Sequence, residues 1–435
     1  MGFTQLPVEL VFYILELINS GYGCCHDEFS PHSKYEGHVG TYRDVAAFAR
    51  VSSAYKDAAY NVLYHTLPAI APEFLASATS DTLKFIRSIN MDLRLASASD
   101  LYFTASTRLQ NVVHYHFILT CDHISNAIDL MRGMSSVRHL EITFIPSNSH
   151  LSRECGTLHF PFLAELSFHS FPAAAIPEVF LDILKVHAPQ LRRLTLSLHG
   201  EVDPQLSNVF KGLSWPLLEH LEVDAITAVI IDALRMAKNI RSFKCSQDTP
   251  GVVSLPDDIL PRLEIVQTPP KQIASFFATQ RQIRIVILNI SHFNFSGTLN
   301  NLMRVPSESV RTLTFDCSLC ERFIACNITP IWHHSIMPGV EMLTFNFRTT
   351  WPVKYKQLTK FGDLYLSRFP SLRQLVISRG IDYVICRRRT VARAQFQQRV
   401  LEKWLQNCPN LQKVTFYDDP ECAEWIVRDG QWVLL

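Results

Sequence analysis

A short pattern of apolar residues recurs along most of the chain, and this repetition constrains the fold more than any other feature. The pattern is apolar-x-x-apolar-x-apolar, and it occurs thirteen times with starts 20 to 39 residues apart. Each instance predicts a short strand with alternating inward residues. Nine instances are clear: V137RHLEI142, L163AELSF168, L191RRLTL196, L218EHLEV223, I240RSFKC245, V310RTLTF315, V340EMLTF345, L372RQLVI377 and L411QKVTF416. Four are weaker: I86RSINM91, L109QNVVH114, L263EIVQT268 and I283RIVIL288.

Stretches with an apolar helical face lie between several of these strands, at 174–187, 225–238, 271–280, 357–369 and 391–407. One strand and one helix cannot bury their apolar faces alone, whereas stacked units share one continuous core. The sequence therefore predicts an α/β solenoid, with a curved parallel sheet and helices on its convex side. The alternative is a doubly wound α/β domain, but no glycine-rich phosphate loop follows any strand.

The composition excludes several classes of protein. Hydrophobic residues make up 47% of 435 residues, so the chain can bury a large core. The net charge is +1, which gives no electrostatic reason to expect binding to nucleic acid or to an anionic membrane. Many of the 11 cysteines sit in apolar runs, as Cys245 does, and this is typical of buried thiols in a reducing compartment. With no signal peptide or membrane span in the sequence, we expect a cytoplasmic or nuclear protein.

The N-terminal region is helical in pattern and differs from the repeats. Residues 5–18 place apolar residues at helical spacing after Pro7, and a second helical pattern begins near Asp44 and reaches residue 67. Such a bundle is too short to bury its own core well, so it is expected to pack on something else. It could also be a capping unit of the solenoid.

This region resembles the F-box motif. The resemblance covers about residues 1–67 and rests on Leu6-Pro7, Glu9-Leu10, Ile14-Leu15, Ala49 to Ser52, Tyr55, Ala59 and Leu63-Tyr64. It implies docking on the Skp linker subunit of SCF ubiquitin ligases, and through it on cullin, by Leu6, Pro7, Ile14, Leu15, Val51 and Leu63. Two departures stand out: Tyr55 replaces the more usual Trp, and residues 19–43 form a long insertion. That insertion either projects away from the docking face or obstructs it.

The repeats over residues 80–417 resemble the degenerate leucine-rich repeats of F-box proteins, especially the fungal type, because the consensus Asn position is mostly missing. The two resemblances together imply three regions: an F-box-like motif at 1–67, a solenoid at 68–417 and a C-terminal cap at 418–435. They also imply a substrate-recognition adaptor of an SCF-type ligase. Two alternatives remain open. One is a repeat scaffold with a vestigial F-box. The other is an enzyme, although no catalytic motif is present.

Residues between the inward strand positions should face the concave side of such a solenoid. This face is polar and carries both signs of charge, which suits a folded protein or peptide. The candidate substrate-binding residues are Glu141, His169, Arg193, Glu222, Lys244, Asp316, Asn346 and Tyr417. Any one of them could instead be an ordinary solvated residue.

Other motifs yield weaker expectations. The cluster Arg387 to Arg389 could bind an acidic partner or act in nuclear import, or could simply be a solvated loop. Neither Cys24, Cys25 and His26 with nearby histidines, nor Cys317, Cys320 and Cys326, supplies four zinc ligands in paired spacing. We therefore predict no metal and no cofactor. The stretch from Trp425 to Leu435 predicts a short hairpin or strand that seals the last repeat.

Overall fold

The computed structural model describes residues 66–67, 78–94, 108–109, 111–145, 158–170, 178–198, 204–247, 255–256, 258–277, 281–290, 308–317, 337–347, 362, 366–378, 390–418 and 421–435. The six predicted linker-docking residues (Leu6, Pro7, Ile14, Leu15, Val51 and Leu63), the insertion at 19–43 and the cluster Arg387 to Arg389 lie outside these ranges. The chain divides into two compact units, unit 1 (residues 1–218) and unit 2 (residues 219–435).

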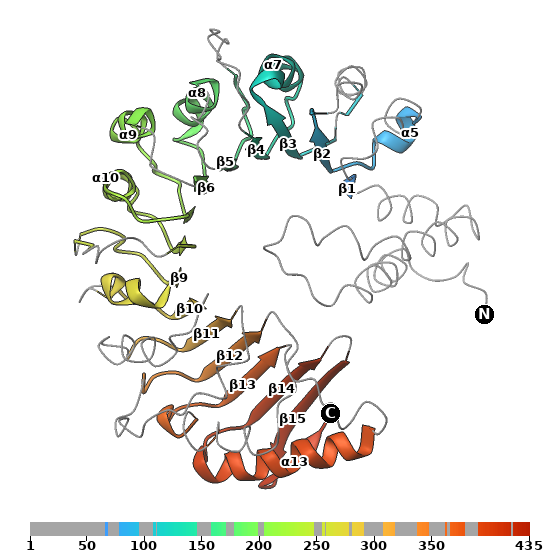
Figure 1. Ribbon diagram of the computed structural model, residues 1–435, viewed down its shortest axis with the longest axis vertical. Coiled ribbons are helices and arrows are strands. Elements are labelled where there is room, and N and C mark those ends of the chain that lie inside the picture. The colour runs from blue at the N-terminus through green and yellow to red at the C-terminus, as the bar shows by residue number, and fades with distance from the viewer. Residues whose placement is uncertain are drawn as a thin grey trace. The chain divides into compact units, whose positions relative to one another are not determined.

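The strands of unit 1 pair in parallel and in chain order (Figure 1). They are β1 (Thr66–Leu67), β2 (Ser88–Asp92), β3 (His114–Thr120), β4 (His139–Ile145), β5 (Glu165–Ser170) and β6 (Arg193–Leu198). Matching repeat positions lie side by side, so that Tyr115, Leu140 and Leu166 form one buried apolar row. This row is the stacked core that the repeat pattern predicts.

The helices of unit 1 lie on the outer side of the curve that its strands follow (Figure 1). They are α5 (Ser80–Leu83), η3 (Cys121–His123), α7 (Ile124–Arg132), α8 (Glu178–His187) and α9 (Pro204–Lys211). Ile128, Leu184 and Phe210 are among the residues that these helices bury. The position of the helices leaves the other side of the sheet, here called the open face, to the remaining strand residues.

Unit 2 continues the same pattern and ends in a hairpin. Its strands β7 (His220–Val223), β8 (Ser242–Cys245), β9 (Ile265–Thr268), β10 (Ile285–Ile290), β11 (Thr312–Cys317), β12 (Met342–Phe347), β13 (Gln374–Ser378) and β14 (Lys413–Asp418) pair in parallel in chain order. The strands β15 (Glu421–Arg428) and β16 (Gln431–Leu434) then pair antiparallel. Their turn places Asp429 and Gly430 at φ 51 and 75°, the positive values that tight hairpins require. The hairpin predicted near the C-terminus is confirmed, although it begins earlier, at Glu421.

The helices described in unit 2 are α10 (Ala228–Met236), η4 (Pro270–Phe276), η5 (Leu366–Arg368) and α13 (Thr390–Asn407). The helix predicted at 391–407 is confirmed. The stretch predicted at 271–280 forms a short 3-10 helix that ends at Phe276. Gly362 packs on the fully buried Trp404, where a Cβ would lie 2.1 Å from the indole Cδ1, so only glycine fits there.

Each unit is therefore an open, mostly parallel repeat solenoid of the leucine-rich type. The alternative of a doubly wound sheet is wrong, because the described strands follow chain order within each unit instead of reversing at a switch point. Cys245 and Cys408 are buried, and the burial of Cys245 is as expected for a thiol in an apolar run. None of the helices in the described ranges has the length and apolar composition that a membrane crossing requires. The predicted domain boundaries at residues 67 and 417 stay predictions.

One weak repeat was predicted in the wrong phase. The instance at 109–114 places His114 inward, but His114 pairs with His139 and Tyr115 pairs with Leu140. The repeat therefore starts at Val112, and the spacings around it become 26 and 25 residues instead of 23 and 28. Because side chains alternate along a strand, a shift by three residues exchanges its two faces. His114 consequently lies on the open face of the sheet.

Candidate binding surface

Strand register gathers polar residues from distant parts of the sequence into rows on the open face of unit 1. One row crosses five strands, β2 to β6, and contains Ser88, His114, His139, Glu165 and Arg193. The next row contains Asn90, His116, Glu141, Ser167 and Thr195. The sheet holds these side chains close together because backbone hydrogen bonds fix one repeat against the next.

Glu141 lies at the centre of a group of imidazoles. Its Oε1 is 3.5 Å from His169 Nε2 and 3.7 Å from His116 Nε2, while its Oε2 is 3.8 Å from His114 Nε2. We call His114, His116, His139, Glu141 and His169 the histidine cluster. At these distances the contacts are electrostatic, whereas His116 Nε2 is within hydrogen-bond distance of Thr143 Oγ1, at 2.9 Å.

The histidine cluster perturbs its own titration. Burial would raise the pKa of Glu141, but the interactions with His114, His116 and His169 outweigh it and lower this pKa to about 2. Burial lowers the pKa of His139 to about 4, and it also lowers the pKa of His116. Near neutral pH the cluster therefore contains an ionised carboxylate beside two neutral imidazoles, His116 and His139.

The rings of His114 and His139 stack, with centroids 4.0 Å apart and planes 10° from parallel. Each ring has a neighbour at Nδ1: Ser88 Oγ lies 3.3 Å from His114, and Glu165 Oε2 lies 3.4 Å from His139. Glu165 Oε2 is in turn 3.9 Å from an Arg193 guanidinium nitrogen. The Nε2 atoms of both rings are buried and have no hydrogen-bond partner in the part of the chain that the structure describes.

The open face of unit 2 is built from different groups. Lys244 Nζ lies 2.5 Å from Glu222 Oε1, and Gln267 Nε2 donates a 2.9 Å hydrogen bond to Asn289 Oδ1. Asp316 lies opposite Asn346 in the pairing of β11 with β12. This face therefore combines amide groups with close ion pairs between neighbouring strands, since Lys413 Nζ also lies 2.8 Å from Glu424 Oε1.

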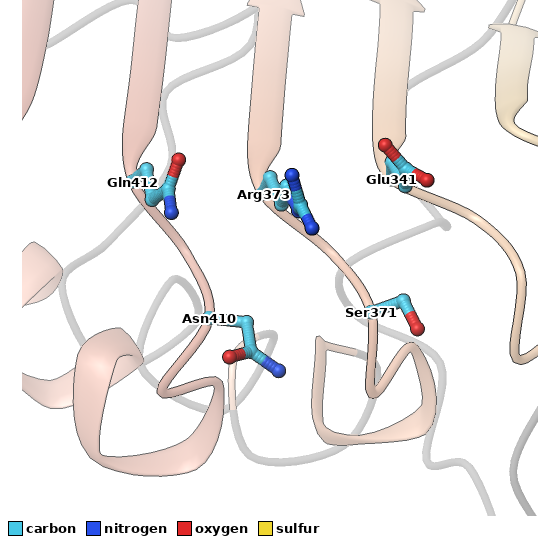
Figure 2. A pocket seen from close by; sticks show the side chains of 5 residues that line it. All are labelled: Glu341, Ser371, Arg373, Asn410 and Gln412. Carbon is cyan, nitrogen blue, oxygen red and sulfur yellow. The ribbon is translucent and has the colours of Figure 1, made fainter.

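A second polar feature of unit 2 lies where the strands begin. Glu341, Ser371, Arg373, Asn410 and Gln412 line a hollow of about 270 Å³ beside the starts of β12, β13 and β14 (Figure 2). Backbone hydrogen bonds from Arg373 N to Glu341 O and from Gln412 N to Arg373 O, both 2.8 Å, fix the alignment of these neighbouring segments. The residue at this repeat position is often arginine, as at Arg138, Arg192, Arg241, Arg284 and Arg311.

The structure divides the predicted substrate-binding residues between the units. Glu141 and His169 are in contact, and Arg193 lies one strand further along, beside Glu165. The other five belong to unit 2: Glu222 and Lys244 form an ion pair, Asp316 and Asn346 are paired, and the Tyr417 backbone pairs with Ser378 and Cys422.

The sequence interpretation missed five members of the rows. Ser88, Asn90 and Glu165 stand between inward positions of predicted repeats but were not named, and the phase error at 109–114 hid His114 and His116. Aligning every repeat on its first inward residue, as on Val112 and Val137, would have found all five. Five other residues at positions expected to face the open side are in fact buried: Ser167, Thr195, Asp224, Val376 and Thr415.

No family model matches this sequence, and no curated protein matches it. Among solved structures, the yeast Rad7 and Elc1 complex matches with a TM-score of 0.36 and 10% identity over 81% of this chain and 96% of that chain. The TLR13–ssRNA13 complex matches with a TM-score of 0.31 and 13% identity, over 73% of this chain and 44% of that chain. The plant peptide hormone receptor RGFR1 in complex with RGF2 matches with a TM-score of 0.26 and 9% identity, over 68% of this chain and 52% of that chain. Scores this low carry no argument, so the solenoid assignment rests on strand order and register.

Proposed function

We propose that this protein is a substrate-recognition adaptor of an SCF-type ubiquitin ligase. In this proposal the open face of the solenoid captures a protein or peptide, and residues 1–67 dock on the Skp linker subunit and through it on cullin. The observation that supports the capture role is the open face of unit 1, where ionisable side chains of both signs stand in register on consecutive strands.

Such a face is suited to recognition because its side chains are already ordered. Binding to a preorganised surface loses less conformational entropy than binding to mobile loops. Carboxylates, imidazoles and Arg193 at fixed spacing favour a partner with the complementary charge pattern and disfavour others. The partner of this proposal is therefore a polar protein surface or peptide of mixed charge.

The ligase role rests on the F-box resemblance of residues 1–67. An adaptor of this kind carries out no chemistry itself, because it acts by raising the effective concentration of its substrate near the ubiquitin-carrying enzyme. Linker docking and partner capture belong to different parts of the chain, so separate variants can remove them one at a time.

The first experiment tests linker docking. Full-length protein and a Leu6→Ala/Pro7→Ala variant are each incubated with purified Skp linker, and the bound fraction is measured by pull-down. We expect the variant to lose most of the binding, whereas a control variant, Arg193→Ala, keeps it. Failure of the wild-type protein to bind, or equal binding by the docking variant, would refute the ligase role and leave a scaffold.

The second experiment tests capture. Co-purification mass spectrometry compares the wild-type protein with Arg193→Ala and with the Leu6→Ala/Pro7→Ala variant. We expect one set of proteins to depend on Arg193 but not on Leu6 and Pro7, and the linker to show the opposite dependence. Partners that are indifferent to Arg193→Ala and to a second open-face variant, Lys244→Ala, would show that capture occurs elsewhere.

A further inference from the structure

We propose that His114, His139 and Glu141 form a binding site for a divalent transition-metal ion of the zinc class, on the open face of unit 1. Each residue offers one ligand atom, and the three atoms all lie within 4.8 Å of one another. This inference does not depend on linker docking or on the identity of a captured protein.

The types of ligand fit the proposed ion. Imidazole nitrogen and carboxylate oxygen are common zinc ligands, with bonds of about 2.0 to 2.2 Å. A tetrahedral site of that size separates its ligand atoms by roughly 3.4 Å. The side chains would therefore have to close by an ångström or so, which small side-chain rotations can supply without moving the strands.

The strongest observation is the unused nitrogen on each ring. His114 Nε2 and His139 Nε2 are buried and have no hydrogen-bond partner among the described residues, although an unsatisfied buried polar atom costs free energy. The same atom is left over on both rings, and both rings offer a ligand atom close to the carboxylate of Glu141. An ion bound there would give both nitrogens a partner and would link them to Glu141.

The opposite nitrogen of each ring has the neighbour that metal-ligating histidines usually have. Such histidines place their other nitrogen against a carboxylate or another polar oxygen, which fixes the ring orientation and the tautomer. Glu165 Oε2 lies 3.4 Å from His139 Nδ1, and Ser88 Oγ lies 3.3 Å from His114 Nδ1. Arg193 lies 3.9 Å from Glu165 Oε2 and holds that carboxylate in turn.

The ring stacking predicts how the site would change on binding. Parallel rings direct their nitrogens side by side, whereas bound imidazoles must both point at the ion, so His114 and His139 would tilt out of their 10° arrangement. His169 lies outside the group whose ligand atoms come within 4.8 Å of one another, so water would supply the fourth ligand. The ion would then link β3 to β4.

The test uses full-length protein freed of metal with a chelator. Zn²⁺ binding is measured by isothermal titration calorimetry and thermal unfolding, and Co²⁺ serves as the spectroscopic probe of coordination. We expect a Zn²⁺ equivalent that is lost in His114→Gln and His139→Gln and weakened at least tenfold in Glu141→Gln. The control His159→Gln removes an exposed histidine of the same unit outside the cluster and should leave binding unchanged.

The Co²⁺ absorption spectrum distinguishes binding at this site from binding to cysteines elsewhere in the chain. Because the three ligands carry no sulfur, Co²⁺ at this site should show d–d absorption without a thiolate charge-transfer band. In His139→Cys the ion should bind again and that band should appear, which places the ion at position 139 even if His139→Gln folds poorly. The absence of Zn²⁺ binding by the wild-type protein would overturn the proposal, as would binding that is unchanged in His114→Gln and His139→Gln.

Discussion

Unit 1 and unit 2 share one strand pattern but carry different chemistry on their open faces. Both bury a continuous apolar row, exemplified by Tyr115, Leu140 and Leu166 in unit 1 and by Leu313, Leu343 and Leu375 in unit 2. The open face of unit 1 holds the histidine cluster, whereas that of unit 2 holds amides and lysine–glutamate ion pairs. The inward positions thus specify the fold, and the outward positions are free to differ.

If the two cores are equivalent, replacing a matched aromatic residue by alanine should lower the free energy of unfolding by the same amount in each unit. Phe117 and Phe345 are both buried strand residues, and Phe345 stacks on Phe315 at 5.0 Å. We expect Phe117→Ala and Phe345→Ala each to lower the free energy of unfolding by about 4 kcal/mol, because each leaves a cavity. Urea denaturation measures this change. A large loss for one variant and a negligible loss for the other would break the equivalence.

Unit 2 contains a buried arginine, Arg281. Arg281 is 4% exposed and donates to the carbonyls of Pro256, Ile259, Ser275 and Phe276. Arg281→Met leaves those carbonyls without this donor, so we expect a loss of about 3 kcal/mol in the free energy of unfolding. The matched control is Arg262→Met, at an exposed residue bonded to Asn239 Oδ1, and its expected cost is below about 0.5 kcal/mol. Equal costs for the two variants would contradict the structural role of Arg281.

Acid should weaken unit 1 through His187, a buried residue whose Nε2 accepts a 3.2 Å hydrogen bond from Phe160 N–H. Burial lowers the pKa of His187 from 6.5 to about 4. The unfolded chain therefore takes up this proton first, and the stability is complete above pH 6.5 and is lost as the pH falls from 6.5 to 4.

Between pH 7 and 4 the wild-type protein should lose about 2 kcal/mol more stability than His187→Gln, less than the full linkage value because local opening can hydrate the ring. Denaturation at several pH values, with hydrogen exchange of peptides from unit 1, measures this difference. Parallel pH profiles for wild type and His187→Gln would rule out the linkage.

The smallest expected effect concerns the ion pair on the open face of unit 2. Lys244 and Glu222 are 2.5 Å apart, with side chains 15% and 33% exposed. Solvent screening limits such a pair, so a double-mutant cycle of Lys244→Met and Glu222→Gln should give a coupling energy of about 0.5 to 1 kcal/mol. Chemical denaturation at low and high salt measures it. A coupling well above this range, unaffected by salt, would show that the pair is more buried than its exposure indicates.

Much of the fold was predictable because repeated apolar spacing is a local signal. The strands from V137RHLEI142 to L411QKVTF416, the helix at 391–407 and the C-terminal hairpin follow from patterns that a single segment contains. The error at 109–114 shows the limit of such signals. Leu109, Val112 and Tyr115 are all buried, so spacing alone did not reveal which of them begins the strand.

The candidate site was less predictable than the fold. Glu141, His169 and Arg193 were assigned to the open face, but no local motif connects them with His114 and His116, which stand on β3. Glu165 begins the strand that also holds His169, and it was not assigned. The expectation of no metal considered only ligands that are close in sequence. The proposed ligands His114 and His139 come instead from two consecutive repeats, and pairing between β3 and β4 brings them together.

The sequence by itself determined the repeat, its strands and the alternation of buried and outward residues, because apolar burial depends on periodicity along the chain. Only the tertiary structure decided which outward residues meet. Parallel pairing places residues one repeat apart side by side, and a slip in register would replace every neighbour. The histidine cluster therefore depends on the alignment of β3, β4 and β5, which backbone hydrogen bonds between the strands fix.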